Sequence, residues 1–418
     1  MLLAYIWIGF FTVAFLLGLI RTFALPETSS LYNLNAIPEM VIALFDSSKG
    51  AFDLAIGLTG VLTLWLGLLK IAEKAGLIEK LSNFIAPFFS KLFPDIPKGH
   101  PVMGGILMNF SANMLGLDNA ATPLGLKAMQ GLQELNTEKE TASNSQIMFL
   151  VLNTSGLTII PINIIMYRAQ LGSESPSDVF IPILITTFVA TLVAMVSVGL
   201  KQKINLLDKT LLTFLISFTI LITLIITLFL QLTPPLIKLY SDLSGNIVLF
   251  GVIVFFLWYG LLKKLNVFEV FVEGAKEGFD VAIRIIPYLV GLLSAITLFK
   301  ASGAFDLIIL GVKSLSDNNT RIVEIAQAIP TALMKPLSGS GSRALMIDTM
   351  TQYGADSFTG RLACIFQGAV DTTFYIVAVY FGSVGVKNTR YAISYGLLAD
   401  FASIIAAIVV SILFFASN

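Results

Sequence analysis

The feature that most constrains this chain is a set of long apolar runs without charged residues. Residues 2–20, 179–200, 210–237 and 243–262 contain no Asp, Glu, Lys or Arg, and residues 391–418 contain only Asp400. A helix of about 20 apolar residues crosses the hydrocarbon core of a bilayer, so each run is long enough to span a membrane. The chain is therefore expected to fold as an all-α polytopic membrane protein.

Four further runs extend this prediction. Residues 54–69 and 285–299 are shorter, and they span if the flanking Lys and Arg side chains reach the headgroups. Residues 141–167 and 362–386 are long enough but carry polar residues inside. The length rule thus gives about nine full spans. Residues 2–20 lack a basic n-region and a following A-x-A site, so we expect a retained first helix rather than a signal peptide.

Composition narrows the classes of function. Of the 418 residues, 56% are hydrophobic and 12% are charged, and 26 Lys and Arg balance 26 Asp and Glu. Because there is no basic excess to displace counterions from phosphates, nucleic-acid binding is not expected. One Cys and one His exclude a disulfide framework and a zinc or iron–sulfur site within one chain, so we expect no metal site and no cofactor.

The chain also contains an internal repeat. Residues 51–56 (AFDLAI) match residues 278–283 (GFDVAI), and Lys49 aligns with Lys276 at the same separation. Each half continues in the same order, with a polar break, a long helix that has a polar centre, and a final apolar helix. We predict a first repeat over residues 1–200, a linker with one transmembrane helix over 201–242, and a second repeat over 243–418.

The positive residues predict how the repeats are oriented. Short basic loops lie on the cytoplasmic side, and those here contain Lys70, Lys74, Lys80, Lys91, Lys98, Lys201, Lys203, Lys209, Lys263, Lys264, Lys276, Lys387 and Arg390. All these loops lie on the cytoplasmic side only if residues 101–133 and about 324–349 each enter and leave the membrane on the same side. Each repeat then crosses an even number of times, and the joining helix inverts the second. We therefore predict two inverted structural repeats, each with a re-entrant or broken-helix hairpin, a design common in secondary transporters.

The first hairpin offers several polar side chains near its break. Asn113, Asp118 and Asn119 supply donors and acceptors, and Pro123 follows Thr122 at the expected start of a half-helix. The exposed N–H groups of such a start attract an anionic or acceptor-rich solute. The alternative is a capped turn that contacts no ligand.

The second hairpin carries a basic residue at its break. Serine and glycine alternate there, over Ser338, Gly339, Ser340, Gly341 and Ser342. Arg343 follows, at the expected start of the next half-helix, and Asp371 is the acidic residue at the centre of the next span. A charge at bilayer depth costs about 2.5–3.5 kcal/mol, so it is usually paired or functional. Two interpretations stay open, a structural Arg–Asp bridge and contact with a substrate or ion.

The polar centres of the two long helices occupy matching positions. They are Asn153-Thr154-Ser155 and Asp371-Thr372-Thr373, with Gln367 nearby, and together they predict one site on the pseudo-twofold axis. Ser and Thr hydroxyls can instead bond to their own helices, but Asn153, Gln367 and Asp371 are not expected to do so. The candidate substrate-binding residues are Asn113, Asp118, Asn119, Thr122, Asn153, Thr154, Ser155, Ser338, Ser340, Ser342, Arg343, Gln367, Asp371 and Thr372.

Three acidic residues outside that set receive separate interpretations. Asp53 and Asp280 lie just before apolar runs and are interpreted as helix N-caps. Asp400 lies in the last span, where the first repeat has Thr187, and it is either an ion relay or a carboxyl paired with a hydroxyl. A coupling proton or sodium ion on Asp371 is also left open.

These motifs carry a family resemblance. Residues 117–125 (LDNAATPLG) with Asn153-Thr154-Ser155 resemble spore maturation protein A, and residues 336–344 (PLSGSGSRA) with 371–375 (DTTFY) resemble spore maturation protein B. The chain looks like a fusion of the two. Both belong to the nucleoside-recognition, or Gate, group, which also occurs in concentrative nucleoside transporters and ferrous-iron permeases. The resemblance implies a permease-like, multi-pass protein of the bacterial inner membrane, but it supplies no substrate.

The sequence therefore favours a permease or secondary transporter whose site for a small polar solute lies at the interface of the two repeats. The alternative is a non-transporting scaffold of a maturation or envelope complex, in which the polar centres only join helices. An enzyme is not expected. An intramembrane hydrolase built on Ser338 or Ser340 needs a base, and His100 lies in the other repeat. The expected partners are the solute and the lipid bilayer, and a homo-oligomer is compatible with the sequence.

Overall fold

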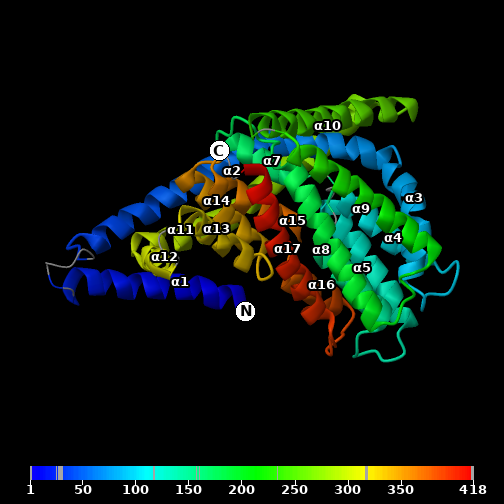
Figure 1. The fold of residues 1–418 in the computed structure, drawn as a ribbon, viewed down its shortest axis with the longest axis horizontal. Coiled ribbons are helices and arrows are strands. Elements are labelled where there is room, and N and C mark those ends of the chain that lie inside the picture. The colour runs from blue at the N-terminus through cyan, green and yellow to red at the C-terminus, as the bar shows by residue number, and fades with distance from the viewer. Residues whose placement is uncertain are drawn as a thin grey trace.

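The computed structural model describes residues 2–24, 26, 32–115, 118–156, 158–159, 161–232, 234–315 and 319–415. The regular structure of these residues is helical, which confirms the predicted all-α class (Figure 1). The first half contains α1 (Leu2–Leu19), a π-helical turn (Ile20–Ala24), α2 (Ala36–Lys74), α3 (Leu77–Leu92), α4 (Pro101–Met114), α5 (Asp118–Leu135), α6 (Asn144–Thr154), α7 (Ile162–Gln170) and α8 (Phe180–Lys201).

The second half repeats this order after one joining helix, α9 (Lys209–Leu230). It contains α10 (Pro234–Leu262), α11 (Val267–Ala301), α12 (Ala304–Leu315), α13 (Thr320–Met334), α14 (Gly339–Tyr353), α15 (Phe358–Ala369), α16 (Thr373–Ser383) and α17 (Ala392–Phe415). Helices α1–α8 therefore have counterparts α10–α17 in the same order. The domain boundaries drawn from the sequence stay a prediction, and α10 begins before residue 243.

The number of membrane-spanning candidates is lower than expected. Seven helices of the described chain are long and apolar enough to cross a membrane, or eight if the bent pair of α11 and α12 counts as one span. The predicted span over 285–299 counts only through this bent pair. The predicted span over 141–167 is lost, because it divides into α6 and α7. Gly156, with φ +62°, and Pro161 lie in the break between them, and each favours interruption of a helix.

The two long helices that carry the sequence repeat, α2 and α11, pack against each other in antiparallel directions. Hydrogen bonds join Ser48 to Ser294 and Thr297 to Ser47 near one end. At the other end, ion pairs join Lys70 to Glu277 and Lys74 to Glu273. Asp53 and Asp280 lie inside these helices, so their interpretation as N-caps was wrong. Each helix begins well before the apolar run that revealed it.

Glycines allow the close approach of α2 and α11. A Cβ at Gly278 would lie 2.6 Å from Cα of Thr63 and 2.8 Å from the carbonyl oxygen of Leu62. Both atoms belong to the α2 backbone, which cannot rotate away as a side chain does. Small residues serve this purpose at helix contacts in membranes, where close packing drives association.

Gly278→Ala is expected to destabilise the protein by about 1–3 kcal/mol, because the added methyl group overpacks this contact. Gly60→Ala, on the facing helix α2, is the matched control, since a Cβ there meets no atom within 4 Å. Because alanine has a higher helix propensity than glycine, Gly60→Ala is expected to stabilise α2 by up to about 1 kcal/mol. The thermal unfolding midpoints of the two purified variants test this, and equal midpoints would contradict the expectation.

Two further sets of contacts between the halves are reciprocal. Helix α1 packs on α11 while α10 packs on α2, and α6 packs on α17 while α15 packs on α8. Helices α8 and α17 run side by side through the centre of the molecule (Figure 1). Lys201 at the end of α8 lies over the ring of Tyr391 before α17, and Ile183 near the start of α8 shares a cluster with Phe414 near the end of α17. This pair is therefore antiparallel as well.

Two helical hairpins occupy the positions predicted for the re-entrant segments. They are α4 with α5, of 14 and 18 residues, and α13 with α14, of 15 residues each. At 1.5 Å per residue these helices are about 20–27 Å long, less than the ~30 Å core of a bilayer.

The half-helices after both breaks begin earlier than predicted. Helix α5 begins at Asp118, so Pro123 lies inside it rather than at its first turn. Helix α14 begins at Gly339, and the Oγ of its N-cap Ser338 accepts a hydrogen bond from the N–H of Gly341. The serine–glycine run is thus the capped first turn of α14 rather than the break that precedes it.

Candidate functional site

The breaks of the two polar-centred helices contact each other, and we call this contact the crossing. It joins the break between α6 and α7 to the break between α15 and α16. The N–H of Asp371 donates to the carbonyl oxygen of Thr154 at 2.9 Å. The Thr187 hydroxyl of α8 lies 2.8 Å from the carbonyl oxygen of Gly156 and 2.6 Å from that of Ala369. The crossing thus satisfies backbone groups that the breaks leave outside helices.

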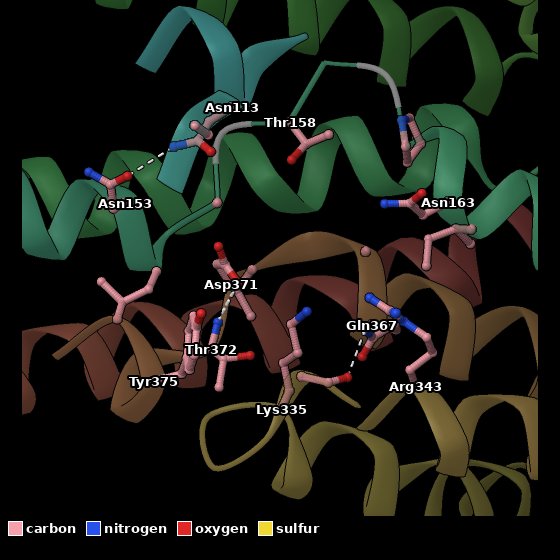
Figure 2. Close-up of a pocket in the computed structure, with 18 of the residues that line it drawn as sticks. Asn113, Asn153, Thr158, Asn163, Lys335, Arg343, Gln367, Asp371, Thr372 and Tyr375 are labelled. Carbon is pink, nitrogen blue, oxygen red and sulfur yellow. Dashed lines mark hydrogen bonds between the residues drawn. The ribbon is translucent and has the colours of Figure 1, made fainter. Parts of the chain in front are cut away.

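A cavity of about 360 Å³ lies beside the crossing. Residues of the first half form one wall and residues of the second half form the facing wall (Figure 2). Its polar lining consists of Asn113, Thr122, Asn153, Thr158, Asn163, Tyr167, Lys335, Arg343, Gln367, Asp371, Thr372, Tyr375 and Tyr380. The helix starts of α7, α14 and α16 also reach it. Ligand cavities of proteins are typically about 300–1,000 Å³, so the volume suits a small solute.

The first-half wall is built on amides. The Nδ2 group of Asn113 donates to Oδ1 of Asn153 at 2.9 Å, as the dashed line in Figure 2 marks. The Nδ2 group of Asn153 donates to the carbonyl oxygen of Phe149, one turn earlier in α6. Asn153 therefore does bond to its own helix, contrary to expectation, while its oxygen faces the first hairpin. This wall offers uncharged donors and acceptors.

The second-half wall carries the charges. Lys335, which is 7% exposed, lies at the end of α13, and the Arg343 guanidinium of α14 lies 5.7 Å from the ring centroid of Tyr167. Oδ1 of Asp371 accepts from the N–H of Thr372 at 2.7 Å. Gln367 is buried, and its Oε1 has no hydrogen-bond partner among the described residues. An acceptor left unpaired beside a cavity is a natural contact for a polar ligand.

The cavity brings together half of the predicted site residues. Seven of them line it, namely Asn113, Thr122, Asn153, Arg343, Gln367, Asp371 and Thr372. The side chains of Asp118 and Asn119 lie outside the described residues. The role of all these residues in binding stays a prediction.

The other predicted site residues that the structure describes do not line the cavity, and their hydroxyls form hydrogen bonds within the protein. Thr154 and Ser155 are buried, and their hydroxyls donate to the carbonyl oxygens of Val151 and Leu152 in their own helix. This is the back-bonding that the sequence left as an alternative. Ser342 donates to the carbonyl oxygen of Thr331, and Ser338 caps α14 while its Oγ lies 3.3 Å from that of Ser340. These contacts fix the hairpin that presents Arg343.

The partnership of Arg343 with Asp371 stays a prediction. Arg343 lies over Tyr167, and Asp371 is held by the backbone of the crossing. Both side chains line the same cavity, so each has a surface that a solute could reach.

Sequence reasoning omitted several lining residues from the site. Asn163 and Tyr375 lie in the first turns of α7 and α16, directly after the breaks. The usable signal was a polar or aromatic residue soon after an interrupted apolar run. Lys335 was visible as a basic residue before the second break, but nothing in the sequence showed that it would be buried against a cavity.

A buried ionic cluster joins the two halves near the cavity. It consists of Arg168 in α7, Asp178 before α8, Asp356 before α15 and Arg361 in α15. Arg168 lies 2.8 Å from a carboxylate oxygen of each aspartate, and Nε of Arg361 lies 2.7 Å from Oδ2 of Asp178. Arg168 follows the cavity residue Tyr167. The cluster therefore holds the end of the cavity at which α7 and α15 meet.

The groups around Asp356, at the partly exposed edge of the cluster, favour its ionised carboxylate. Burial alone would raise the pKa of Asp356, but hydrogen bonds from the Ser173 hydroxyl and the Glu174 N–H, with the charge of Arg168, hold that pKa below its ordinary value. A carboxyl with a lowered pKa stabilises the fold above the pKa of the unfolded chain, and that contribution is lost as the pH falls through the folded-state value.

Comparison with known proteins gives matches in both halves. The Gate family, described as nucleoside recognition, matches residues 55–173. Spore maturation protein A of Bacillus subtilis (strain 168) is 47% identical over 154 residues, which are 37% of this chain and 79% of that protein. Spore maturation protein B of the same organism is 46% identical over 161 residues, which are 38% of this chain and 89% of that protein. The two relatives match different parts of the chain, which confirms the predicted resemblance to a fusion.

Proposed function

We propose that this chain, which belongs to the family of spore maturation proteins A and B, is a permease for a small polar solute in the bacterial cytoplasmic membrane. The observation that carries the proposal is the cavity of about 360 Å³ between the halves, lined by amides and by charged side chains of short, interrupted helices. Non-helical backbone and charges at membrane depth are costly, and they are tolerated where they line a cavity.

The arrangement of the halves supports alternating access. The counterpart helices α2 and α11 are antiparallel, and so are α8 and α17. If these helices span the bilayer, the two halves enter it with opposite orientations, as inverted repeats do. The short hairpins α4–α5 and α13–α14 then bring their breaks to the cavity from opposite sides. Rocking of one half against the other would expose the cavity to each side in turn.

The scaffold alternative predicts a different structure for the contact between the halves. A protein that only assembles partners needs a tightly packed junction, because its polar groups serve to join helices. Here the polar groups surround a cavity, and Gln367 keeps an unpaired acceptor beside it.

The hydrolase alternative needs a free serine and a base. Ser338 and His100 instead accept backbone hydrogen bonds as the N-caps of α14 and α4. Both observations favour the permease.

Uptake into proteoliposomes tests the proposal. The panel contains nucleosides first, because the matching family is described by nucleoside recognition, then amino acids, organic acids and metal ions. Accumulation of one class above protein-free vesicles is the expected result. Absence of uptake and of binding for every class would favour the scaffold.

Substitution of the charged wall gives the sharper measurement. Arg343→Ala and Asp371→Asn are each expected to weaken binding of the identified solute about 10–100-fold, since a hydrogen bond to a charged group contributes about 1.5–3 kcal/mol. Asp53→Asn is the matched control, because Asp53 is exposed on α2 and does not line the cavity. Unchanged binding in both wall variants would refute the site assignment and leave the permease class standing.

A further inference from the structure

A buried carboxyl that does not line the cavity lies at the crossing, beside the start of α16. Asp400 of α17 is 3% exposed. Its Oδ2 accepts a hydrogen bond from the Thr373 hydroxyl at 2.7 Å, while its Oδ1 has no hydrogen-bond partner among the described residues. Buried polar atoms are nearly always paired, so an unpaired carboxylate oxygen at this depth calls for a chemical reason.

The space around Asp400 is formed by three elements. One turn earlier in α17, Gly396 faces the same region, and a Cβ there would lie 3.4 Å from Oγ1 of Thr154 and 3.5 Å from Oγ1 of Thr373. The hydroxyl groups of α6 and α16 therefore converge on the side of α17 that carries Asp400. Because Thr154 belongs to the first half and Thr373 to the second, the carboxyl lies where movement of one break past the other changes its surroundings.

The two halves differ at this point. On α8, the counterpart of α17, the Thr187 hydroxyl lies against the two breaks and contacts their carbonyl oxygens. In the second half, a carboxyl contacts the start of α16 instead. A hydroxyl would satisfy the structural need equally well, so the acid in α17 adds an ability to exchange a proton.

Two charged side chains line the cavity, Lys335 at the end of α13 and Asp371 in the break before α16. Asp371 lies two residues before Thr373, whose hydroxyl bonds to Asp400. A nearby cation favours the ionised form of a carboxyl, and a nearby anion disfavours it. A solute that contacts Lys335 or Asp371 changes the field at Asp400. The protonation of Asp400 is thus linked to occupancy of the cavity without direct contact between the carboxyl and the solute.

We infer that Asp400 is a proton-binding site and, on the basis of the proposed function, the group that couples proton movement to transport. The carboxyl holds a proton on its unpaired oxygen in the described conformation. When the breaks separate, the O–H bond ionises, the proton passes to water in the cavity, and the carboxylate keeps the electron pair. A metal cation needs several converging oxygen ligands, whereas a proton needs only the one free oxygen that is present.

Infrared difference spectroscopy of the full-length protein in lipid, recorded as the pH is raised, tests the site directly. The wild type is expected to lose the C=O stretch of a protonated carboxylic acid, and Asp400→Asn is expected to lack that band at every pH. Asp371→Asn removes a repelling charge, so its band should disappear at lower pH than in the wild type. Lys335→Gln removes an attracting charge and should shift the loss to higher pH.

Several results would overturn the inference. A band that persists in Asp400→Asn assigns the proton to another residue. A band that disappears only on addition of sodium at constant pH assigns a metal cation to the site. If Asp400→Asn does not fold, Asp400→Thr, which copies the Thr187 side chain of the first half, replaces it in the same measurement.

Transport separates this inference from the proposed function. With the identified solute, Asp400→Asn is expected to retain solute exchange across the vesicle membrane and to lose accumulation driven by a pH gradient. A titrating band in a protein that transports no solute would leave the proton site intact and remove the permease. Accumulation driven by a pH gradient in Asp400→Asn would remove the coupling role alone.

Discussion

Asp178→Ala is expected to lower the free energy of unfolding by about 3–5 kcal/mol, because it removes the carboxylate that two buried arginines share. Both side chains of the Arg168–Asp178 pair are 0% exposed, and Arg361 bonds to the other oxygen of the same carboxylate. Asp356 still contacts Arg168 at the rim, but Arg361 then has only a 3.9 Å contact to a carboxylate. The thermal unfolding midpoint of the purified protein measures the loss.

The pair of Lys387 with Glu140 provides the control. It also joins the two halves, but its side chains are 74% and 69% exposed. Lys387→Ala is expected to change stability by at most about 1 kcal/mol, since water and salt screen an exposed pair. Similar midpoints for the two variants would show that the ionic cluster contributes no more than a surface ion pair, and its role in holding the halves together would fall.

The sequence predicted the all-α class well because the signals for helices are local. Long apolar runs identify helices by length alone. The matching residues 51–56 and 278–283 lie in α2 and α11, which the structure packs together. The polar centres around Asn153 and Asp371 were also found, and the structure places both at the same cavity. A polar residue inside an apolar run is conspicuous whatever the tertiary fold.

Other features could not be found because their causes are distant in the sequence. The ionic cluster joins Arg168 to Asp356 and Asp178 to Arg361, and no spacing rule connects residues so far apart. The first residues of α2 and α11 were predicted wrongly for a different reason. Apolar runs show where a helix becomes buried in lipid, whereas α2 and α11 begin many residues earlier and pair with each other along their polar ends. Burial of Lys335 likewise depends on tertiary packing.

Gly156→Ala is expected to disrupt the crossing, at a cost of about 2–5 kcal/mol, because two unfavourable effects combine there. The residue has φ +62°, a conformation that side chains with a Cβ adopt at a cost. An added Cβ would also lie 2.8 Å from the amide nitrogen of Asp371 and 2.9 Å from the carbonyl carbon of Val370. Both are backbone atoms of the other half, so the contact is relieved only if the breaks move apart.

Gly172→Ala is the matched control, because it has the backbone effect without the steric one. Gly172 has φ +79°, but a Cβ there meets no atom within 4 Å, so only the backbone term of about 1–2 kcal/mol applies. The difference between the two unfolding midpoints therefore measures the cost of separating the breaks. Solute binding should follow the same order, because the crossing positions Asn153 and Asp371 on opposite walls of the cavity. If Gly156→Ala unfolded at the same temperature as Gly172→Ala and bound solute equally well, contact between the breaks would not be what shapes the site.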